Sequence, residues 1–133
     1  QGSFGYHLAY EQGLFAFEPV YGADRFYTLS AADGLASAEL VLSRVPASLD
    51  AAALSLLTAD GASEGPASMI NWHAARTVRV VTGEDPLSPV IVHTLIELNN
   101  GELLTCQARY ALGDEATLGA KLLQMVESLQ FFY

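Results

Sequence analysis

The chain has 133 residues, of which 51% are hydrophobic and 16% charged, and its formal net charge is −9. Its length and hydrophobic content predict a single domain over residues 1–133 with one core, and they exclude intrinsic disorder. Because only six basic residues stand against fifteen acidic ones, the chain lacks the cations with which proteins bind nucleic acid or anionic membranes. No apolar run approaches the roughly 18 residues of a transmembrane helix.

The N-terminal part of the chain alternates apolar and polar side chains in short runs. Residues 6–10 and 15–17 place apolar or aromatic side chains at every second position, which is the period of a β-strand. The loop between these two runs contains a glycine, so the pattern predicts an aromatic hairpin. Two further strands are expected over residues 25–29 and 37–45, and Pro46 ends the second of them.

A helix is predicted over residues 49–59, where alanine and leucine dominate. Ser48 stands at the N-cap position, and Asp50 lies in the first turn, where a carboxylate interacts favourably with the positive end of the helix dipole. The helix is expected to end near Asp60 and Gly61, and residues 61–66 are expected to form a loop.

Three more strands are expected over residues 74–82, 90–98 and 102–112. The middle strand, VIVHTLIEL, is apolar on both faces, so we expect it to be covered on both sides of a sheet. The Asn100-Gly101 pair between the last two strands favours a type I′ hairpin, because both central residues of that turn need a positive φ.

A second helix is predicted near the C-terminus, with Asp114 as its N-cap and Glu115 in its first turn. Apolar residues recur along it at helical spacing and form one stripe. Strands joined by short turns and two helices together predict an α+β fold, an antiparallel sheet flanked by the helices in a layered α/β sandwich. The residues of the stripe are Leu118, Leu122, Met125, Val126 and Leu129.

Three local features occur in an order that resembles a known family. They are the aromatic strands of residues 6–17, the strand-Pro-helix passage of residues 40–57 with the Ile70-Asn71 turn and Ala75 after it, and the helix ending in ESLQF at residues 127–131. In these features the chain resembles the Mog1/PsbP-like group, which includes small bacterial secreted and lipoprotein domains.

The resemblance implies a sheet flanked by helices and no catalytic residues, because this fold serves mostly in binding and assembly. The group more often has glycine after the Ile-Asn pair, whereas this chain has Trp72 there.

The residues that could carry catalysis or bind a metal show no recognisable pattern. His7, His73 and His93 are far apart and lack the local ligand pairs typical of zinc sites. Cys106 shares strand parity with apolar residues, which predicts an inert, buried thiol. The sequence also contains no phosphate-binding loop and no nucleophile elbow. We therefore expect no metal and no cofactor.

The stretch from Ser68 to Val80 holds the only tryptophan of the chain and two of its six basic residues. Arg76 and Arg79 have opposite parity in the expected strand, so their side chains should point to opposite faces and pair with acidic residues at the sheet margins. Trp72 is expected to cap the edge of the core. If it is exposed instead, it is the best candidate for a contact anchor.

Three functions remain open. The first is a non-enzymatic domain of a bacterial cell-envelope protein, acting through protein–protein contact. The start at Gln1 without methionine, followed by a glycine-rich stretch, suggests a trimmed N-terminus with a leader or lipid anchor upstream. We therefore expect an extracytoplasmic location, with the cytoplasm as the alternative.

The second is a small-ligand-binding domain that uses the aromatic N-terminal region, in which Tyr6, Tyr10, Tyr21 and Tyr27 are candidate contact residues. The third is a hydrolase whose catalytic groups come together only in the folded chain.

Overall fold

A computed structural model describes residues 6–10, 13–20, 22–28, 38–98 and 101–131. Within these ranges one sheet has eight strands in the order β2-β3-β4-β9-β8-β7-β5, with β6 also paired to β7, and a separate ribbon joins β1 to β10. Every pairing between these strands is antiparallel, as predicted. The elements are β1 (Tyr6–His7), β2 (Phe15–Val20), β3 (Ala23–Thr28), β4 (Ala38–Val45), α1 (Leu49–Leu57), β5 (Ala62–Glu64), β6 (Ser68–Ile70), β7 (His73–Val81), β8 (Pro89–Glu97), β9 (Leu103–Ala111), α2 (Ala120–Glu127) and β10 (Gln130–Phe131).

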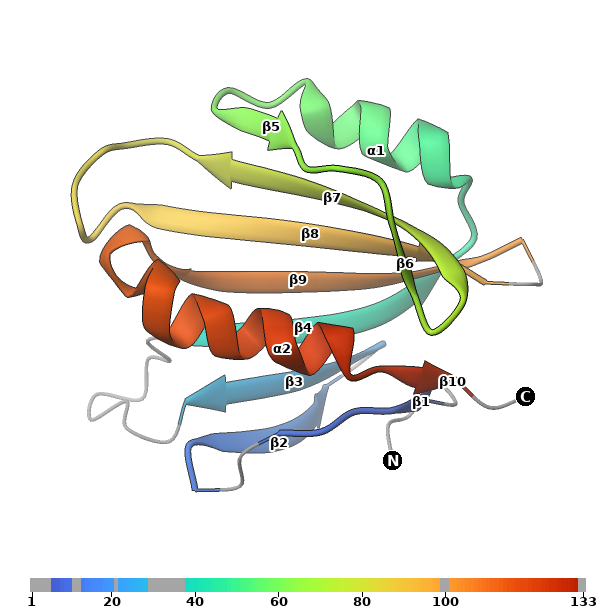
Figure 1. The fold of residues 1–133 in the computed structure, drawn as a ribbon, viewed down its shortest axis with the longest axis horizontal. Coiled ribbons are helices and arrows are strands. Elements are labelled where there is room, and N and C mark those ends of the chain that lie inside the picture. The colour runs from blue at the N-terminus through green and yellow to red at the C-terminus, as the bar shows by residue number, and fades with distance from the viewer. Residues whose placement is uncertain (1–5, 11–12, 21, 29–37, 99–100, 132–133) are drawn as a thin grey trace.

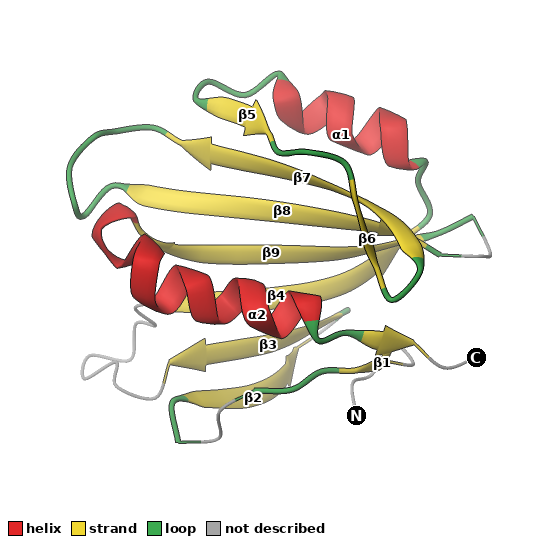
Figure 2. Cartoon of the chain, viewed as in Figure 1, coloured by secondary structure: helices red, strands yellow, loops and turns green. Residues whose placement is uncertain are grey.

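The two helices pack on opposite faces of the sheet, which confirms the α+β sandwich. Neighbouring residues of β8 separate the two sides, because Leu95 packs with Ala53 of α1 whereas Ile96 belongs to the larger core beneath α2. Figures 1 and 2 show α2 lying across the middle of the sheet and α1 lying near the edge formed by β5 and β7. The strand that is apolar on both faces is therefore covered on both sides, as expected.

Helix α1 begins as the sequence predicts. The Oγ atom of Ser48 accepts a hydrogen bond of 3.2 Å from the backbone N–H of Ala51, which satisfies one of the free donors of the first turn. The segment 61–66, which we expected to be a loop, contains the short strand β5 paired with β7. Its three residues include serine and glutamate and show no apolar alternation, so the backbone pairing leaves no trace in the sequence pattern.

The predicted aromatic hairpin is wrong in its pairing. The strand that starts at Tyr6 pairs with the C-terminal strand, with Tyr6 opposite Phe131, while the strand that starts at Phe15 pairs with β3. In Figure 1 β1 and β10 accordingly lie side by side, although one is near the start of the described chain and the other near its end. Periodicity identifies a strand but does not choose its partner, which here depends on the burial of Tyr6 in the core.

The hairpin between β8 and β9 is confirmed. The N–H of Leu98 donates to the carbonyl oxygen of Glu102 at 2.9 Å. Gly101 has a φ of 81°, a left-handed value that glycine adopts without strain. Asn99 and Asn100 lie outside the described residues.

The approach to α2 also differs from the prediction. Asp114 makes no capping hydrogen bond with its side chain. Instead, residues 112–114 form a 3₁₀ turn, residues 115–119 form a π-helical turn, and the α-helix begins at Ala120. A Cβ atom on Gly119 would lie 2.9 Å from Cζ of Tyr110, so only glycine lets this turn rest on the tyrosine ring.

The apolar stripe of α2 is buried as predicted, through Leu122, Met125, Val126 and, just beyond the helix, Leu129. Among the helices of the described ranges, none combines the length and the hydropathy needed to cross a membrane.

Candidate functional site

The hairpin between β6 and β7 carries the most exposed large apolar side chain of the described residues. Trp72 is 88% exposed, and Met69 on β6 is 63% exposed. We call Met69 and Trp72 the hairpin-tip surface. The expectation that Trp72 caps the edge of the core is therefore wrong, because its indole is turned almost wholly toward solvent.

The turn at this tip holds its tryptophan in an unfavourable backbone conformation. Ile70 pairs with His73, so the turn has two residues, and Asn71 and Trp72 have φ values of 48° and 69°. These are the left-handed dihedrals of a type I′ turn, which asparagine tolerates but a bulky aromatic residue adopts only at a cost of about 1–2 kcal/mol. Trp72 therefore stands in a position where glycine would fit without strain.

The base of the same hairpin is fastened to two other parts of the fold. The Nδ1 atom of His73 donates to the carbonyl oxygen of Glu97 at 2.8 Å. The ring of His73 also meets the ring of Phe131 edge-on, with 4.8 Å between their centroids. The tip therefore projects from a base held by both β8 and the β1–β10 ribbon.

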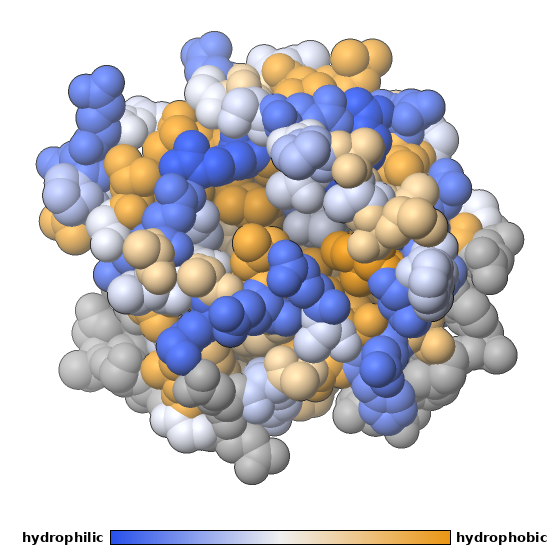
Figure 3. Space-filling view, viewed as in Figure 1, coloured by the Kyte–Doolittle hydropathy of each residue, from blue (hydrophilic) through white to orange (hydrophobic). Residues whose placement is uncertain are grey.

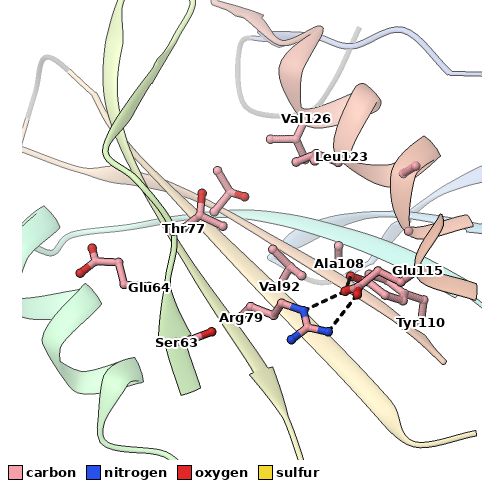
Figure 4. A pocket seen from close by; sticks show the side chains of 14 residues that line it. Ser63, Glu64, Thr77, Arg79, Val92, Ala108, Tyr110, Glu115, Leu123 and Val126 are labelled. Atoms are coloured by element: carbon pink, nitrogen blue, oxygen red, sulfur yellow. Dashed lines mark hydrogen bonds and ion pairs between the residues drawn. The ribbon is translucent and has the colours of Figure 1, made fainter. Parts of the chain in front are cut away.

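A second candidate site is the ionic group where the π-helical turn meets the sheet. Arg79 of β7 donates to both carboxylate oxygens of Glu115, from Nε at 2.8 Å and from Nη2 at 2.9 Å. The hydroxyl of Tyr110 on β9 donates to the same carboxylate at 2.6 Å. Figure 4 shows the Arg79 and Glu115 side chains meeting across the gap between sheet and helix.

These contacts shift the pKa values of all three side chains. The hydrogen bonds from Arg79 and then Tyr110 lower the pKa of Glu115 below the ordinary value for glutamate. The pKa of Arg79 is raised, mainly by its hydrogen bonds to Glu115. Burial, followed by the hydrogen bond to Glu115, raises the pKa of Tyr110 to about 12. At neutral pH the group is therefore an ion pair with a neutral phenol attached.

Arg76 points to the opposite face of the sheet from Arg79, as the parity of the strand predicts. It binds Glu64 of β5 through two hydrogen bonds of 2.6 and 2.9 Å and Asp50 of α1 through one of 2.9 Å. Both arginines therefore pair with acidic residues, and they do not clamp a shared anion.

A cavity of about 480 Å³ lies between α2 and strands β5, β7, β8 and β9. We call it the helix–sheet cavity. Figure 3 shows hydrophobic surface between α2 and the β5–β7 edge, rimmed by hydrophilic side chains. In Figure 4 the Arg79–Glu115 pair lies at one side of the cavity, and Leu123 and Val126 of α2 extend from the helix above it.

The aromatic residues expected to bind a ligand are not brought together around one cleft. Tyr6 is buried, and its hydroxyl donates to Asp24 at 2.7 Å, which favours a structural role. Tyr10 lines a smaller cavity of about 320 Å³ beside α2. The half-buried ring of Tyr27 lies 4.4 Å from the guanidinium carbon of Arg25. Tyr21 lies outside the described residues.

The histidines and the cysteine do not assemble a reactive centre within the described ranges. No group of three or more His, Cys, Asp or Glu side chains there could hold a metal ion. Burial lowers the pKa of His93, which keeps it neutral at physiological pH. Cys106 is fully buried, and burial raises the pKa of its thiol well above the ordinary range. A fully buried thiol of this kind is typical of a structural cysteine.

Sequence reasoning did not identify the Tyr110–Glu115–Arg79 group or the cavity beside it. The strand parity of Arg79 was correct, but nothing in the sequence showed that α2 covers that face. The small residues Ala108, Gly119 and Ala120, which line the cavity, were the available signal, because small side chains at a helix–sheet interface leave space.

No protein-family model matches the sequence, and no curated protein sequence matches it. Solved structures do match. LpqN of Mycobacterium tuberculosis, which is involved in cell envelope biogenesis, aligns with a TM-score of 0.71 and 13% identity over 96% of this chain and 83% of that chain. The Ran-binding protein Mog1p of Saccharomyces cerevisiae aligns with a TM-score of 0.60 and 13% identity over 96% of this chain and 90% of that chain.

The cyanobacterial PsbP of Synechocystis aligns with a TM-score of 0.60 and 13% identity, over 96% of this chain and 87% of that chain. At identities this low the likeness is one of fold. It agrees with the element order, the antiparallel sheet and the two covering helices described above. The chain has the Mog1/PsbP-like α+β fold.

Proposed function

We propose that this chain is a non-enzymatic domain of the bacterial cell envelope that acts by binding another protein through the hairpin-tip surface. The observation that carries the proposal is the exposure of Trp72, 88%, in a backbone conformation that disfavours it. A side chain that is strained and contributes little burial does not serve the fold, and strain of this kind is concentrated at functional sites. Tryptophan is also among the residues most enriched in interface hot spots.

Two of the structural neighbours support this reading. LpqN is involved in cell envelope biogenesis, and Mog1p is a Ran-binding protein. Their low identity transfers neither partner to this chain. They support the use of this fold to present a surface to other macromolecules. The role of LpqN in the cell envelope also supports the extracytoplasmic location that we propose for this chain.

The chemistry of the hairpin-tip surface and the charge of the chain describe the partner. An exposed indole and an exposed, flexible thioether on one hairpin suit an apolar pocket that buries the ring and adapts to Met69. The net charge of −9 favours a basic rim around that pocket, since complementary charge steers association and selects partners.

Site-specific photo-crosslinking in cells of the source organism tests the proposal. A benzophenone amino acid replaces Met69, which is exposed on the same hairpin as Trp72 without being the proposed anchor. We expect one discrete adduct, which disappears when Trp72→Gly is added, because truncating a hot-spot residue typically costs about 2 kcal/mol or more of binding free energy.

The matched control is Leu87→Ala. Leu87 is 84% exposed and lies in the connection after β7, at the other end of that strand from the hairpin. We expect this variant to keep the adduct. A crosslink that survives Trp72→Gly, or the absence of any crosslink from position 69, contradicts the proposal.

The proposed location is tested separately by protease accessibility in intact cells that carry the full-length protein. An extracytoplasmic domain is digested or released without lysis, and a lipid-anchored one is recovered with the membrane fraction. Protection until the cells are lysed places the domain in the cytoplasm and contradicts this part of the proposal.

A further inference from the structure

We propose that the helix–sheet cavity binds a small uncharged molecule with an apolar body and one hydroxyl or carbonyl group, such as an aliphatic alcohol or ester. The cavity has a volume of about 480 Å³, within the range of roughly 300–1,000 Å³ that small-molecule sites occupy. It lies on the face of the sheet covered by α2, and none of the residues that line it belongs to the hairpin-tip surface. The inference is therefore independent of the proposed protein contact.

The walls of the cavity are apolar and built from small side chains. Val92 and Ala108 face it from the sheet, and Ala120, Leu123 and Val126 face it from the helical side. The cavity opens to solvent beside Leu123, which is 45% exposed, and beside the Arg79–Glu115 pair, whose side chains are 35% and 39% exposed. That ion pair joins the start of the helical segment to the sheet at the border of the cavity.

The charged groups that border the cavity are already neutralised. Arg79 is paired with Glu115 through both carboxylate oxygens, and Glu64 is paired with Arg76 in the same bidentate manner. An ionised ligand entering such a space would lose its hydration and find no free counter-charge, which is strongly unfavourable. A neutral ligand avoids this cost.

Two threonine hydroxyl groups lie on the sheet side of the cavity. Thr77 of β7 and Thr94 of β8 are directly opposite each other in the sheet, and both line the cavity. Thr94 is only 3% exposed. Neither side chain hydrogen-bonds to another residue in the part of the chain that the structure describes. The Thr94 hydroxyl is not among the fully enclosed unpaired polar atoms of the described residues, so it is open to the cavity. A ligand oxygen that reaches this pair can hydrogen-bond to both hydroxyls.

The apolar walls and the hydroxyl pair together define the ligand class. The walls suit a hydrocarbon body, and each threonine hydroxyl can donate one hydrogen bond and also accept. A single hydroxyl or carbonyl oxygen at one end of a hydrocarbon body matches both features.

Binding is measured by fluorescence with the neutral apolar probe N-phenyl-1-naphthylamine on the whole chain. We expect saturable enhancement at one site, and competition by decanol. Decanoate and decyltrimethylammonium, which have the same chain length with a negative or a positive head, should compete about tenfold or more weakly, equivalent to about 1.4 kcal/mol. Equal competition by either ion, or no saturable probe binding, overturns the proposal.

Two helix variants distinguish the cavity from general surface adsorption. Leu123→Trp places an indole at the mouth of the cavity, whereas Leu54→Trp places one on α1, on the opposite face of the sheet. Both leucines are exposed, by 45% and 67% respectively, so both variants should fold. We expect Leu123→Trp to weaken probe binding about tenfold or more and Leu54→Trp to leave it unchanged. Equal effects of the two variants on probe binding contradict the proposal that the probe binds in the helix–sheet cavity.

Thr94→Val tests the hydroxyl pair, because valine keeps the shape of threonine and removes its oxygen. We expect weaker competition by decanol, with no loss of thermal stability in the ligand-free protein, since the lost hydroxyl has no hydrogen-bond partner among the described residues. Competition by decane, which carries no oxygen, should be unaffected. An unchanged affinity for decanol in this variant contradicts the role assigned to the hydroxyls.

Discussion

The hydroxyl of Tyr6 donates a hydrogen bond of 2.7 Å to Oδ2 of Asp24, and both residues are buried. This contact joins the terminal ribbon of β1 and β10 to β3 of the main sheet. Burial and the bond to Asp24 raise the pKa of Tyr6 far above the ordinary value for tyrosine. The phenol therefore remains protonated at neutral pH and serves as a hydrogen-bond donor to Asp24.

Tyr6→Phe should lower the free energy of unfolding by about 1–3 kcal/mol, because it leaves a buried carboxylate with one hydrogen-bond donor fewer. Urea denaturation followed by circular dichroism measures the change. Tyr27→Phe is the matched control, since that half-buried hydroxyl makes no hydrogen bond to another described residue, and its loss should change stability by less than about 0.5 kcal/mol. Equal effects of the two variants would show that the contact with Asp24 contributes nothing.

Trp72→Gly should stabilise the isolated domain by about 0.5–1 kcal/mol. Glycine removes the left-handed strain at a φ of 69°, and its greater entropy in the unfolded chain offsets part of that gain. Trp72→Ala removes the indole but keeps a Cβ atom, so it should give a smaller gain. Thermal or urea unfolding of the three proteins checks this order, and a loss of stability in Trp72→Gly would show that the indole supports the fold.

Glu115 should make the stability of the domain sensitive to acid. Its pKa is lowered in the folded protein, so the folded state binds fewer protons than the unfolded state as the pH falls below the ordinary glutamate value of about 4.3. The contribution of the pair with Arg79 is therefore fully present above that value, and it is lost as the pH falls through the folded pKa.

Urea midpoints of the wild type and of Glu115→Gln, measured from neutral pH down to about pH 3, test this dependence. We expect the difference between the two proteins to shrink as the pH falls. Glu84→Gln, at an exposed carboxylate with no ion pair to another described residue, is the control and should show no such trend. A difference in urea midpoint that stays constant with pH would contradict the predicted dependence of stability on the protonation of Glu115.

Gly119→Ala should destabilise the protein by about 1–3 kcal/mol, the typical cost of overpacking. The added Cβ atom would meet the ring of Tyr110 at 2.9 Å and displace the phenol from Glu115. Gly13→Ala is the control, because a Cβ atom there would have no neighbour within 4 Å, and it should be neutral. Chemical denaturation compares the two variants. Similar unfolding midpoints would contradict the prediction, because they would mean that the Tyr110 ring moves aside without loss of stability.

Local patterns predicted the elements where one face of the sequence is apolar. Alternation located β7, β8 and β9, helical spacing located the buried stripe of α2, and Ser48 capped α1 as expected. The opposite parity of Arg76 and Arg79 also placed them on opposite faces. These features depend on neighbours within a few residues, which a sequence displays directly.

The errors concern contacts between distant segments. The pairing of β1 with β10, the strand character of Ala62–Glu64 and the π-helical turn before α2 are decided by which surfaces meet in the folded chain. Local periodicity carries no information on a partner more than a hundred residues away, and a three-residue edge strand held by backbone hydrogen bonds needs no particular side chains.

The sequence by itself determined the α+β class, the two helices, the antiparallel character of the sheet and the lack of a local catalytic or metal-binding motif. These features depend on periodicity and residue type. It also identified Trp72 as unusual for its position. Only the tertiary structure decided that this indole points into solvent, that Asp24 is buried against Tyr6, and that Thr77 and Thr94 lie together in a cavity beneath α2. Each of these depends on the register of paired strands and on which helix covers which face, and both are set by long-range packing.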